Sequence, residues 1–88
     1  MSVATALRWD LSGTFIRRAD LSFADLEGAN FTEADCKNAI FRGANFKDTI
    51  LKGTVLKGAD LSGARNLTRA QIEQAIIDET TILPASLQ

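Results

Sequence analysis

The amino-acid sequence predicts an all-β solenoid, because its apolar, small and glycine residues all recur with a period of five from Trp9 to Gly63. An apolar residue stands at the centre of each pentad, and Ala or Thr stands two positions earlier in every pentad but the first. All six glycines lie two positions after a centre. A regular repeat of this kind is typical of folds built by stacking identical units. The centres are Leu11, Ile16, Leu21, Leu26, Phe31, Cys36, Phe41, Phe46, Leu51, Leu56 and Leu61.

A period of five fits neither regular element. On an α-helix, five residues advance about 500°, so successive centres lie about 140° apart and no apolar stripe forms. On a straight strand, an odd period sends successive centres to opposite faces. The chain must therefore bend once per pentad, and glycine supplies the positive φ of a tight corner. Asn38 and Asp48 at the glycine position tolerate that conformation. Arg18, Phe23 and Glu33 at the same position suggest corners of another turn type.

Several pentads carry a specific resemblance to a known family. Ala-Asp-Leu-Ser-Phe at 19–23, Ala-Asp-Leu-Glu-Gly at 24–28, Ala-Asn-Phe-Thr-Glu at 29–33 and Ala-Asp-Leu-Ser-Gly at 59–63 resemble pentapeptide-repeat proteins. The resemblance extends over eleven pentads, from Trp9 to Gly63. It implies a right-handed quadrilateral β-helix of about three coils, in which four pentads make one coil and residues twenty apart stack.

That arrangement implies four inner columns of side chains. Three phenylalanines then occupy the middle coil, and Cys36 is the small fourth member beside them, which indicates volume compensation in a packed interior. We therefore expect Cys36 to be buried and chemically inert. The columns are Leu11/Phe31/Leu51, Ile16/Cys36/Leu56, Leu21/Phe41/Leu61 and Leu26/Phe46.

A short solenoid must close its ends, because a bare end exposes core and unpaired backbone. Thr68 and Gln71 form a T-x-x-Q capping box, which predicts a helix over 69–77 that lids the last coil. Leu67 and Ile72 stand at the hydrophobic-staple positions around this box.

The chain accordingly divides into three parts. Residues 1–8 form an N-terminal cap or degenerate repeat, 9–65 form the pentapeptide-repeat β-helix, and 66–88 form the C-terminal capping helix and its tail. We expect Trp9 to cover the first coil, and the tail from residue 78 onward to lie along the barrel.

Composition argues against an enzyme. The 88 residues contain no histidine and one cysteine, so the usual pairs of nucleophile and base cannot be assembled. One thiol also excludes an internal disulfide and a cysteine-based zinc site. The frequent Asp and Asn before the centres are expected to bond turn backbone. We expect no cofactor, no metal and no small-molecule substrate. The absence of a secretory pattern at the N-terminus and of a long apolar run predicts a cytoplasmic protein with no membrane contact.

One side of the predicted coil carries a basic column. Arg17, Lys37 and Lys57 stack at one position, with Arg18 adjacent and Asp35 within the group. Such a column is either a solvated edge or a site for an anionic partner, protein or nucleic acid. Four cations without stacking aromatic residues are a weak indication of nucleic-acid binding.

Several outward positions are apolar. They are Phe15, Phe23, Ile40, Ile50 and Val55, which would form a sticky patch if they were exposed together. Either residues 1–8 cover Phe15 and Phe23 and residues 78–88 cover the other three, or the patch is a surface for a dimer or another partner. We expect cover, and hence a monomer.

Two classes of function stay open. The first is a structural or protein-interaction module that presents a rigid surface to an unidentified protein. The second follows from the resemblance, because some pentapeptide-repeat proteins imitate B-form DNA and bind DNA gyrase. Those proteins are longer and acidic. Here residues 1–69 hold ten cationic against eight acidic residues, so we rank the gyrase alternative second.

Overall fold

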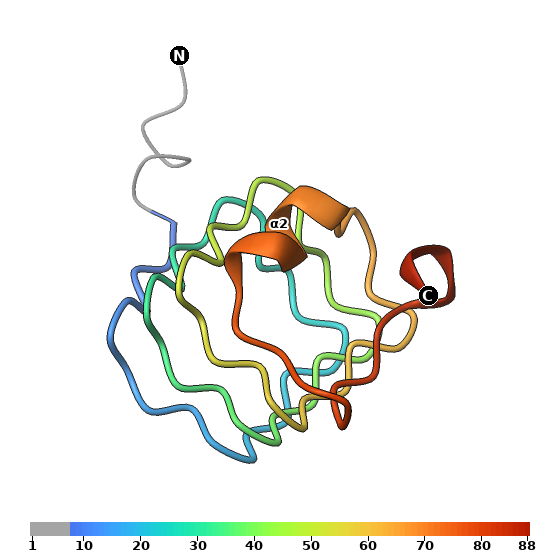
Figure 1. Ribbon diagram of the computed structural model, residues 1–88. Coiled ribbons are helices and arrows are strands. Elements are labelled where there is room, and N and C mark those ends of the chain that lie inside the picture. The colour runs from blue at the N-terminus through green and yellow to red at the C-terminus, as the bar shows by residue number, and fades with distance from the viewer. Residues whose placement is uncertain (1–7) are drawn as a thin grey trace.

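The computed structural model describes residues 8–88, which wind into coils stacked one on another (Figure 1). Parallel β-bridges join residues twenty apart in the repeat region, so four pentads complete one coil, as predicted. Each side of a coil contributes a single bridging residue rather than a longer strand. No helix within residues 8–88 is long and apolar enough to cross a bilayer. The twenty-residue bridges are Asp10–Asn30, Phe15–Asp35, Asp20–Ile40, Asp25–Asn45, Asn30–Ile50, Asp35–Val55, Ile40–Asp60 and Asn45–Arg65.

Backbone hydrogen bonds hold each coil to the coils before and after it. The Asn30 N–H donates to the Trp9 carbonyl of the preceding coil at 2.8 Å. The next N–H, of Phe31, donates to the Ile50 carbonyl of the following coil at 2.9 Å. The same alternation recurs on every side, so a coil pairs fully only when it has a neighbour at both ends.

Every corner has the same backbone conformation. A corner residue has a φ of 58° to 72° whether or not it is glycine, and Arg18, Phe23 and Glu33 have values of 60°, 61° and 58°. The expectation of another turn type at these three positions is therefore wrong. A left-handed conformation costs a residue with a side chain about 1 kcal/mol. The ladder imposes it nevertheless, because the corner N–H bonds to the next coil, as Arg18 does to the Lys37 carbonyl at 3.0 Å.

The middle coil forms the core, as the columns predict. Phe31 and Phe41 meet edge to face with ring centroids 6.1 Å apart, and Phe46 lies 5.4 Å from Phe41. Cys36 is fully buried beside them. Thr49 and Thr54 are also buried, and each hydroxyl donates to a carbonyl of the coil below at 2.7 Å. Their polar atoms are thus satisfied within the core.

The C-terminal segment begins with helix α2, Arg69–Gln74, which lies across the last coil in Figure 1. The predicted capping box is present, since Thr68 accepts from the Gln71 N–H and the Gln71 side chain accepts from the Thr68 N–H. The helix ends three residues before its expected end. Ile76 instead pairs in parallel with Val55, and its β-branched side chain suits that extended conformation.

The tail continues the ladder on top of the last coil. Ile82 pairs in parallel with Asp60, donating to the Ala59 carbonyl at 2.9 Å and accepting from the Leu61 N–H at 2.7 Å. A 3-10 turn, η1, follows at Ala85–Leu87. The expectation that the tail lies along the barrel wall is therefore wrong for its paired part, because the open edge of the third coil offers it backbone partners.

Candidate interaction surface

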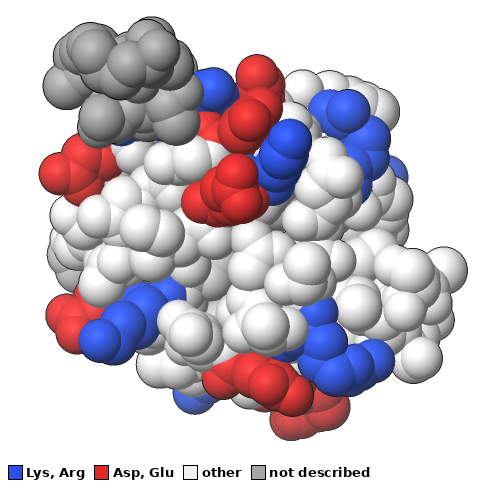
Figure 2. Space-filling model, turned by 90° about the horizontal axis from the view of Figure 1, so that it is seen from above, with Lys and Arg blue, Asp and Glu red and all other residues white. Residues whose placement is uncertain are grey.

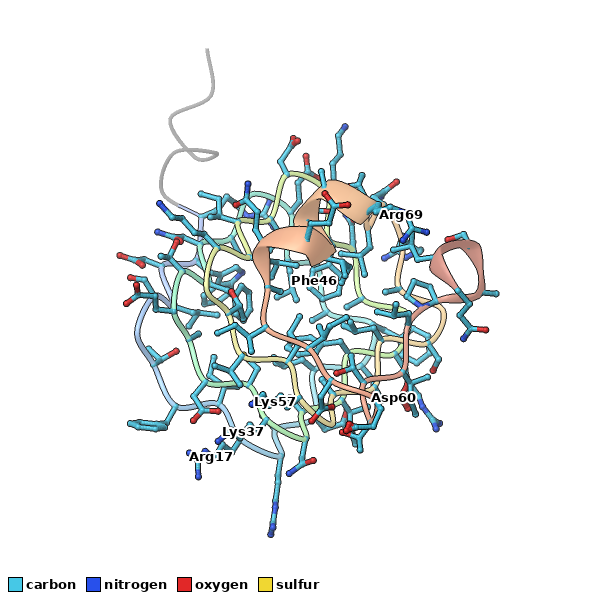
Figure 3. All side chains as sticks on the ribbon, viewed as in Figure 1. Arg17, Lys37, Phe46, Lys57, Asp60 and Arg69 are labelled. Carbon is cyan, nitrogen blue, oxygen red and sulfur yellow. The ribbon has the colours of Figure 1, made fainter. Side chains whose placement is uncertain are left out.

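The basic column lies on the second side of the coil, which consists of residues 14–18, 34–38 and 54–58. Figure 3 shows Arg17, Lys37 and Lys57 in a row along this side, as predicted from their spacing. Arg18 follows at the corner, where it is exposed.

An ion pair occupies the first level of the column. The Arg17 guanidinium lies 2.7 Å from a carboxylate oxygen of Asp35 on the next coil. This contact is the first cause that lowers the pKa of Asp35, and it raises the pKa of Arg17. The same guanidinium lies 5.6 Å from the centre of the exposed Phe15 ring, a cation–π contact. Arg17 is thus held against its own wall rather than free to reach a ligand.

A second carboxylate lies at the other end of the column. Asp78 accepts hydrogen bonds from the Thr80 hydroxyl and backbone, which lower its pKa, and the Lys57 ammonium lowers it further. The four cations of the column therefore face two carboxylates of this chain. Figure 2 shows the same mixing of positive and negative side chains on the face seen from above. Such interspersed charge produces no strong field of one sign.

The apolar wall residues do not form one patch. The bridges place Ile50 on the first side, above Asn30, and Val55 on the second side, above Asp35. Ile40 lies on the third side, between Asp20 and Asp60. The idea of a single patch made by Ile40, Ile50 and Val55 was therefore wrong, because a closed coil turns each successive pentad to a new side.

Partial exposure remains at these positions. Ile50 is 47% exposed, whereas Ile40 and Val55 are half-buried. Val55 has Ile76 directly above it in the ladder, and Ile82 extends the column of Ile40 beyond Asp60. Phe15 and Phe23 remain exposed, and most of the segment expected to cover them lies outside the described residues.

The Asp and Asn residues before the centres bond turn backbone, as predicted. Each accepts from the N–H two residues later, as Asp10 does from Ser12 at 3.1 Å and Asn45 from Lys47 at 3.2 Å. Ser or Thr at that later position adds its hydroxyl to the same oxygen, as Ser22 does to Asp20 at 2.6 Å. The other members are Asp25, Asn30, Asp35 and Asp60. These carboxylate and amide oxygens are therefore already engaged in the fold.

Chemically reactive groups are scarce on the surface. Burial, followed by the nearby Asp35 carboxylate, raises the pKa of the Cys36 thiol to about 12, so the thiolate that reacts is not formed at neutral pH. Among residues 8–88, no three His, Cys, Asp or Glu side chains converge as metal ligands, and every buried side-chain polar atom has a hydrogen-bond partner.

The expected N-terminal cap or degenerate repeat, residues 1–8, lies outside the described residues except for Arg8. Trp9 is 60% exposed, and together with Leu11, Leu21 and Leu26 it lines a cavity of about 320 Å³ at the first coil.

Comparison with solved structures finds other repeat proteins. HetL, a pentapeptide-repeat protein involved in heterocyst differentiation regulation from Nostoc sp. strain PCC 7120, is 24% identical over 85% of this chain and 40% of its own, with a TM-score of 0.48. Rfr23 from Cyanothece 51142 is 26% identical over 86% of this chain and 61% of its own, with a TM-score of 0.39. A third, from Nostoc PCC 7120, is 25% identical over 96% and 81%, with a TM-score of 0.39.

The chain thus spans about two fifths of HetL and three fifths of Rfr23. No curated protein sequence matches it. The family model for pentapeptide repeats matches in eight copies, over residues 10–48, 29–65 and 39–81. Together these ranges extend over most of the sequence. The chain therefore belongs to the pentapeptide-repeat family, whose fold is a right-handed β-helix solenoid.

Proposed function

We propose that this protein is a non-enzymatic interaction module, which presents the rigid wall of a quadrilateral β-helix to a partner protein. The observation that carries the proposal is the engagement of the wall carboxylates by backbone N–H groups two residues on. Groups held in this way are poor acids, bases or metal ligands, but they hold the outward side chains between them in a regular array.

The C-terminal segment completes the module as a cap. Leu67 and Ile72 are buried in the same cluster as the last coil. The Gln71 side-chain amide donates to the Phe46 and Thr49 carbonyls at 2.8 and 2.9 Å. About three coils closed in this way form a stub that resists bending, which lowers the entropy lost when a partner binds.

The second side is the surface we assign to the partner. Arg18, Lys37 and Lys57 are not in ion pairs within the described residues, and only Lys57 has a carboxylate of the tail near it. A protein segment with two or three spaced carboxylates matches this column. Nucleic acid fits less well, because the column is short and Asp35 and Asp78 interrupt its charge. The buried single thiol is compatible with a reducing, cytoplasmic location.

Affinity capture with charge-reversed baits tests this assignment. The double variant Lys37→Glu and Lys57→Glu alters the second side. The matched control, Lys47→Glu and Lys52→Glu, makes the same charge change on the fourth and first sides.

Each full-length bait is incubated with native lysate, and the bound proteins are quantified by mass spectrometry. We expect a protein whose enrichment falls about tenfold or more with the first variant and is unchanged with the control. Equal loss with both baits, or no loss with either, would contradict the second side as the surface.

The gyrase alternative makes a separate prediction. Imitation of DNA needs a wall that is predominantly acidic, whereas the second side carries four cations against two carboxylates. We expect no inhibition of gyrase supercoiling at micromolar concentrations of the purified chain. A dose-dependent block would reverse the ranking of the two functions.

A further inference from the structure

We propose that the groove between α2 and residues 46–53 binds an extended segment of a partner protein, which continues the backbone ladder there. The proposal does not depend on the partner assigned to the second side, because this groove lies where the fourth side of the coil meets the first. Three observations support it: two adjoining cavities beside α2, two backbone donors without acceptors, and the groups that pair with the equivalent donors one coil earlier.

Two adjoining cavities form the groove. The larger has a volume of about 490 Å³ and is lined in part by Lys47 and Asp48 at the corner of the coil. The smaller has a volume of about 220 Å³ and lies between Leu51 on the first side and Ala70 on α2. Thr49 and Gln71 line both cavities. The two cavities are therefore neighbours, and together they follow the edge of the coil around its corner.

The backbone ladder is interrupted along this groove. On either side of it, the N–H groups of Phe46 and Gly53 donate to carbonyls of the C-terminal segment at 2.9 and 2.8 Å. Between them, the N–H groups of Asp48 and Leu51 have no acceptor among the described residues. Helix α2 crosses the coil here in place of an extended side (Figure 1). Leu51 is only 2% exposed, and a buried donor without an acceptor favours any group that supplies one.

The equivalent positions twenty residues earlier show which group fits these donors. The Gly28 N–H donates to the Lys47 carbonyl at 2.9 Å. The Phe31 N–H donates to the Ile50 carbonyl, also at 2.9 Å. Both acceptors are backbone carbonyls, three residues apart in one chain. A peptide segment that offers two such carbonyls can therefore pair with the open donors, as peptides do when they add to the edge of a sheet.

The charges at the groove favour a peptide over a small anion. Lys47 and Asp48 are adjacent and exposed, and neither is in an ion pair within the described residues. A small anion would meet the carboxylate as well as the ammonium group. A segment with an acidic and a basic residue side by side complements both. At the other end, Ile50 is 47% exposed and offers contact to an apolar side chain of the same segment.

Selection from a library of random heptapeptides displayed on phage, with the full 88-residue chain as the target, tests the proposal. Selected peptides are synthesised, and their affinities are measured by fluorescence anisotropy. Ala70→Trp fills the smaller cavity from an exposed position of α2. Ala85→Trp is the matched control, because it places the same side chain at an exposed position of η1 that lines neither cavity. The double variant Lys37→Glu and Lys57→Glu is a second control, because it alters only the second side.

We expect selected peptides to carry adjacent acidic and basic residues and to bind Ala70→Trp about tenfold or more weakly than the wild type. Both controls should bind them as the wild type does. In nuclear magnetic resonance spectra of the wild type, a bound peptide should move the amide proton resonances of Asp48 and Leu51 downfield, because each gains an acceptor.

Three results would overturn the proposal: no enriched peptide, peptides that bind Ala70→Trp as tightly as the wild type, or an unchanged Leu51 amide resonance in the complex. Loss of binding with the second-side variant would place the peptides on that side, which overturns this proposal and leaves the proposed function intact. If Ala70→Trp loses its fold, the two amide resonances of the wild type decide.

Discussion

The two ends of the coil stack are built from the same repeat but finish differently. At the C-terminal end, α2 buries Ile72 against the core and the tail pairs with the open edge at Val55 and Asp60. At the N-terminal end, Leu11 is half-buried, and the N–H groups of Asp10, Phe15 and Asp20 have no acceptor among the described residues. Inside a solenoid, each coil finds backbone partners and apolar cover in its two neighbouring coils. Each end needs residues that depart from the repeat to supply them.

Gln71 shows how few residues such a departure requires. Its side-chain oxygen accepts from the Thr68 N–H at 2.8 Å, which starts the helix. Its side-chain nitrogen donates to two carbonyls of the coil below, at Phe46 and Thr49. One amide therefore both begins α2 and attaches it to the stack. The N-terminal end has no equivalent among the described residues.

Removing the C-terminal end should have the largest effect. Deletion of residues 66–88 exposes the inward side chains of the last coil and the carbonyl and N–H groups that pair with the tail. We expect the truncated chain to associate end to end or to aggregate, since the exposed edge of the last coil can then template pairing. Size-exclusion chromatography with light scattering measures this. A truncated chain that remains folded and has the same oligomeric state as the full chain would show that α2 is not a cap.

Leucine-to-alanine substitutions at equivalent positions of one column should lower stability by different amounts at the two ends. Leu51 is buried under the cap, whereas Leu11, in the same column of the first coil, is half-buried. We expect Leu51→Ala to lower the free energy of unfolding by about 3 kcal/mol, and Leu11→Ala by about 1 kcal/mol, because less apolar area and a smaller cavity are involved. Urea unfolding followed by circular dichroism gives both values. Equal losses would mean that the first coil is as well buried as the third.

Loss of the Gln71 amide should have a moderate effect. Gln71→Ala leaves two carbonyls of the coil and the Thr68 N–H without their partner, and we expect it to cost about 1–2 kcal/mol of stability. Gln74→Ala is the control, since that side chain is exposed at the end of the same helix. Thermal unfolding of both variants makes the comparison. A larger loss from Gln74→Ala would contradict the attachment of α2 through Gln71.

The smallest expected effect is on the stability of the protein at acidic pH. Hydrogen bonds from Ser12 lower the pKa of Asp10, and hydrogen bonds from Thr80 lower that of Asp78. A carboxylate whose pKa is lower in the folded state stabilises the protein above about pH 4, and this contribution is lost as the pH falls through the folded pKa. Asp10→Asn and Asp78→Asn keep an acceptor oxygen, so each should leave stability at pH 7 nearly unchanged.

The difference should appear only in acid. Each variant is expected to show a shallower loss of stability than the wild type between about pH 4 and pH 2, measured by urea unfolding at successive pH values. A curve that coincides with that of the wild type would show that the corresponding carboxylate is not engaged in the folded state.

Local patterns predicted much of this molecule. The inward centres, the Asp and Asn bonds to turn backbone, the burial of Cys36 and the capping box at Thr68 all follow from residues within five positions of one another. Each is decided by side-chain size or by a hydrogen bond to a near neighbour, and such short-range constraints can be found directly in the order of residues.

Other features depend on contacts between residues that are distant in sequence. Helix α2 ends at Gln74 because Ile76 finds a partner at Val55, and Phe23 takes a left-handed conformation because its N–H bonds to the Arg42 carbonyl of the next coil. The prediction of a single apolar patch that includes Ile40 and Ile50 was wrong for the same reason. Ile40 and Ile50 are only ten residues apart, but closure of the coil places them on opposite sides.

The closure of the C-terminal end belongs to this second group. The repeat pattern predicts that each coil pairs with a coil before and after it. It does not predict which residues close the stack. At the C-terminal end, Ile76 and Ile82 pair with the last coil and so close it. Residue order thus decides the inward and outward face of every pentad, because that choice is local. Tertiary structure decides which side of the coil an outward residue occupies and which ends are closed, because both depend on pairing across twenty residues or more.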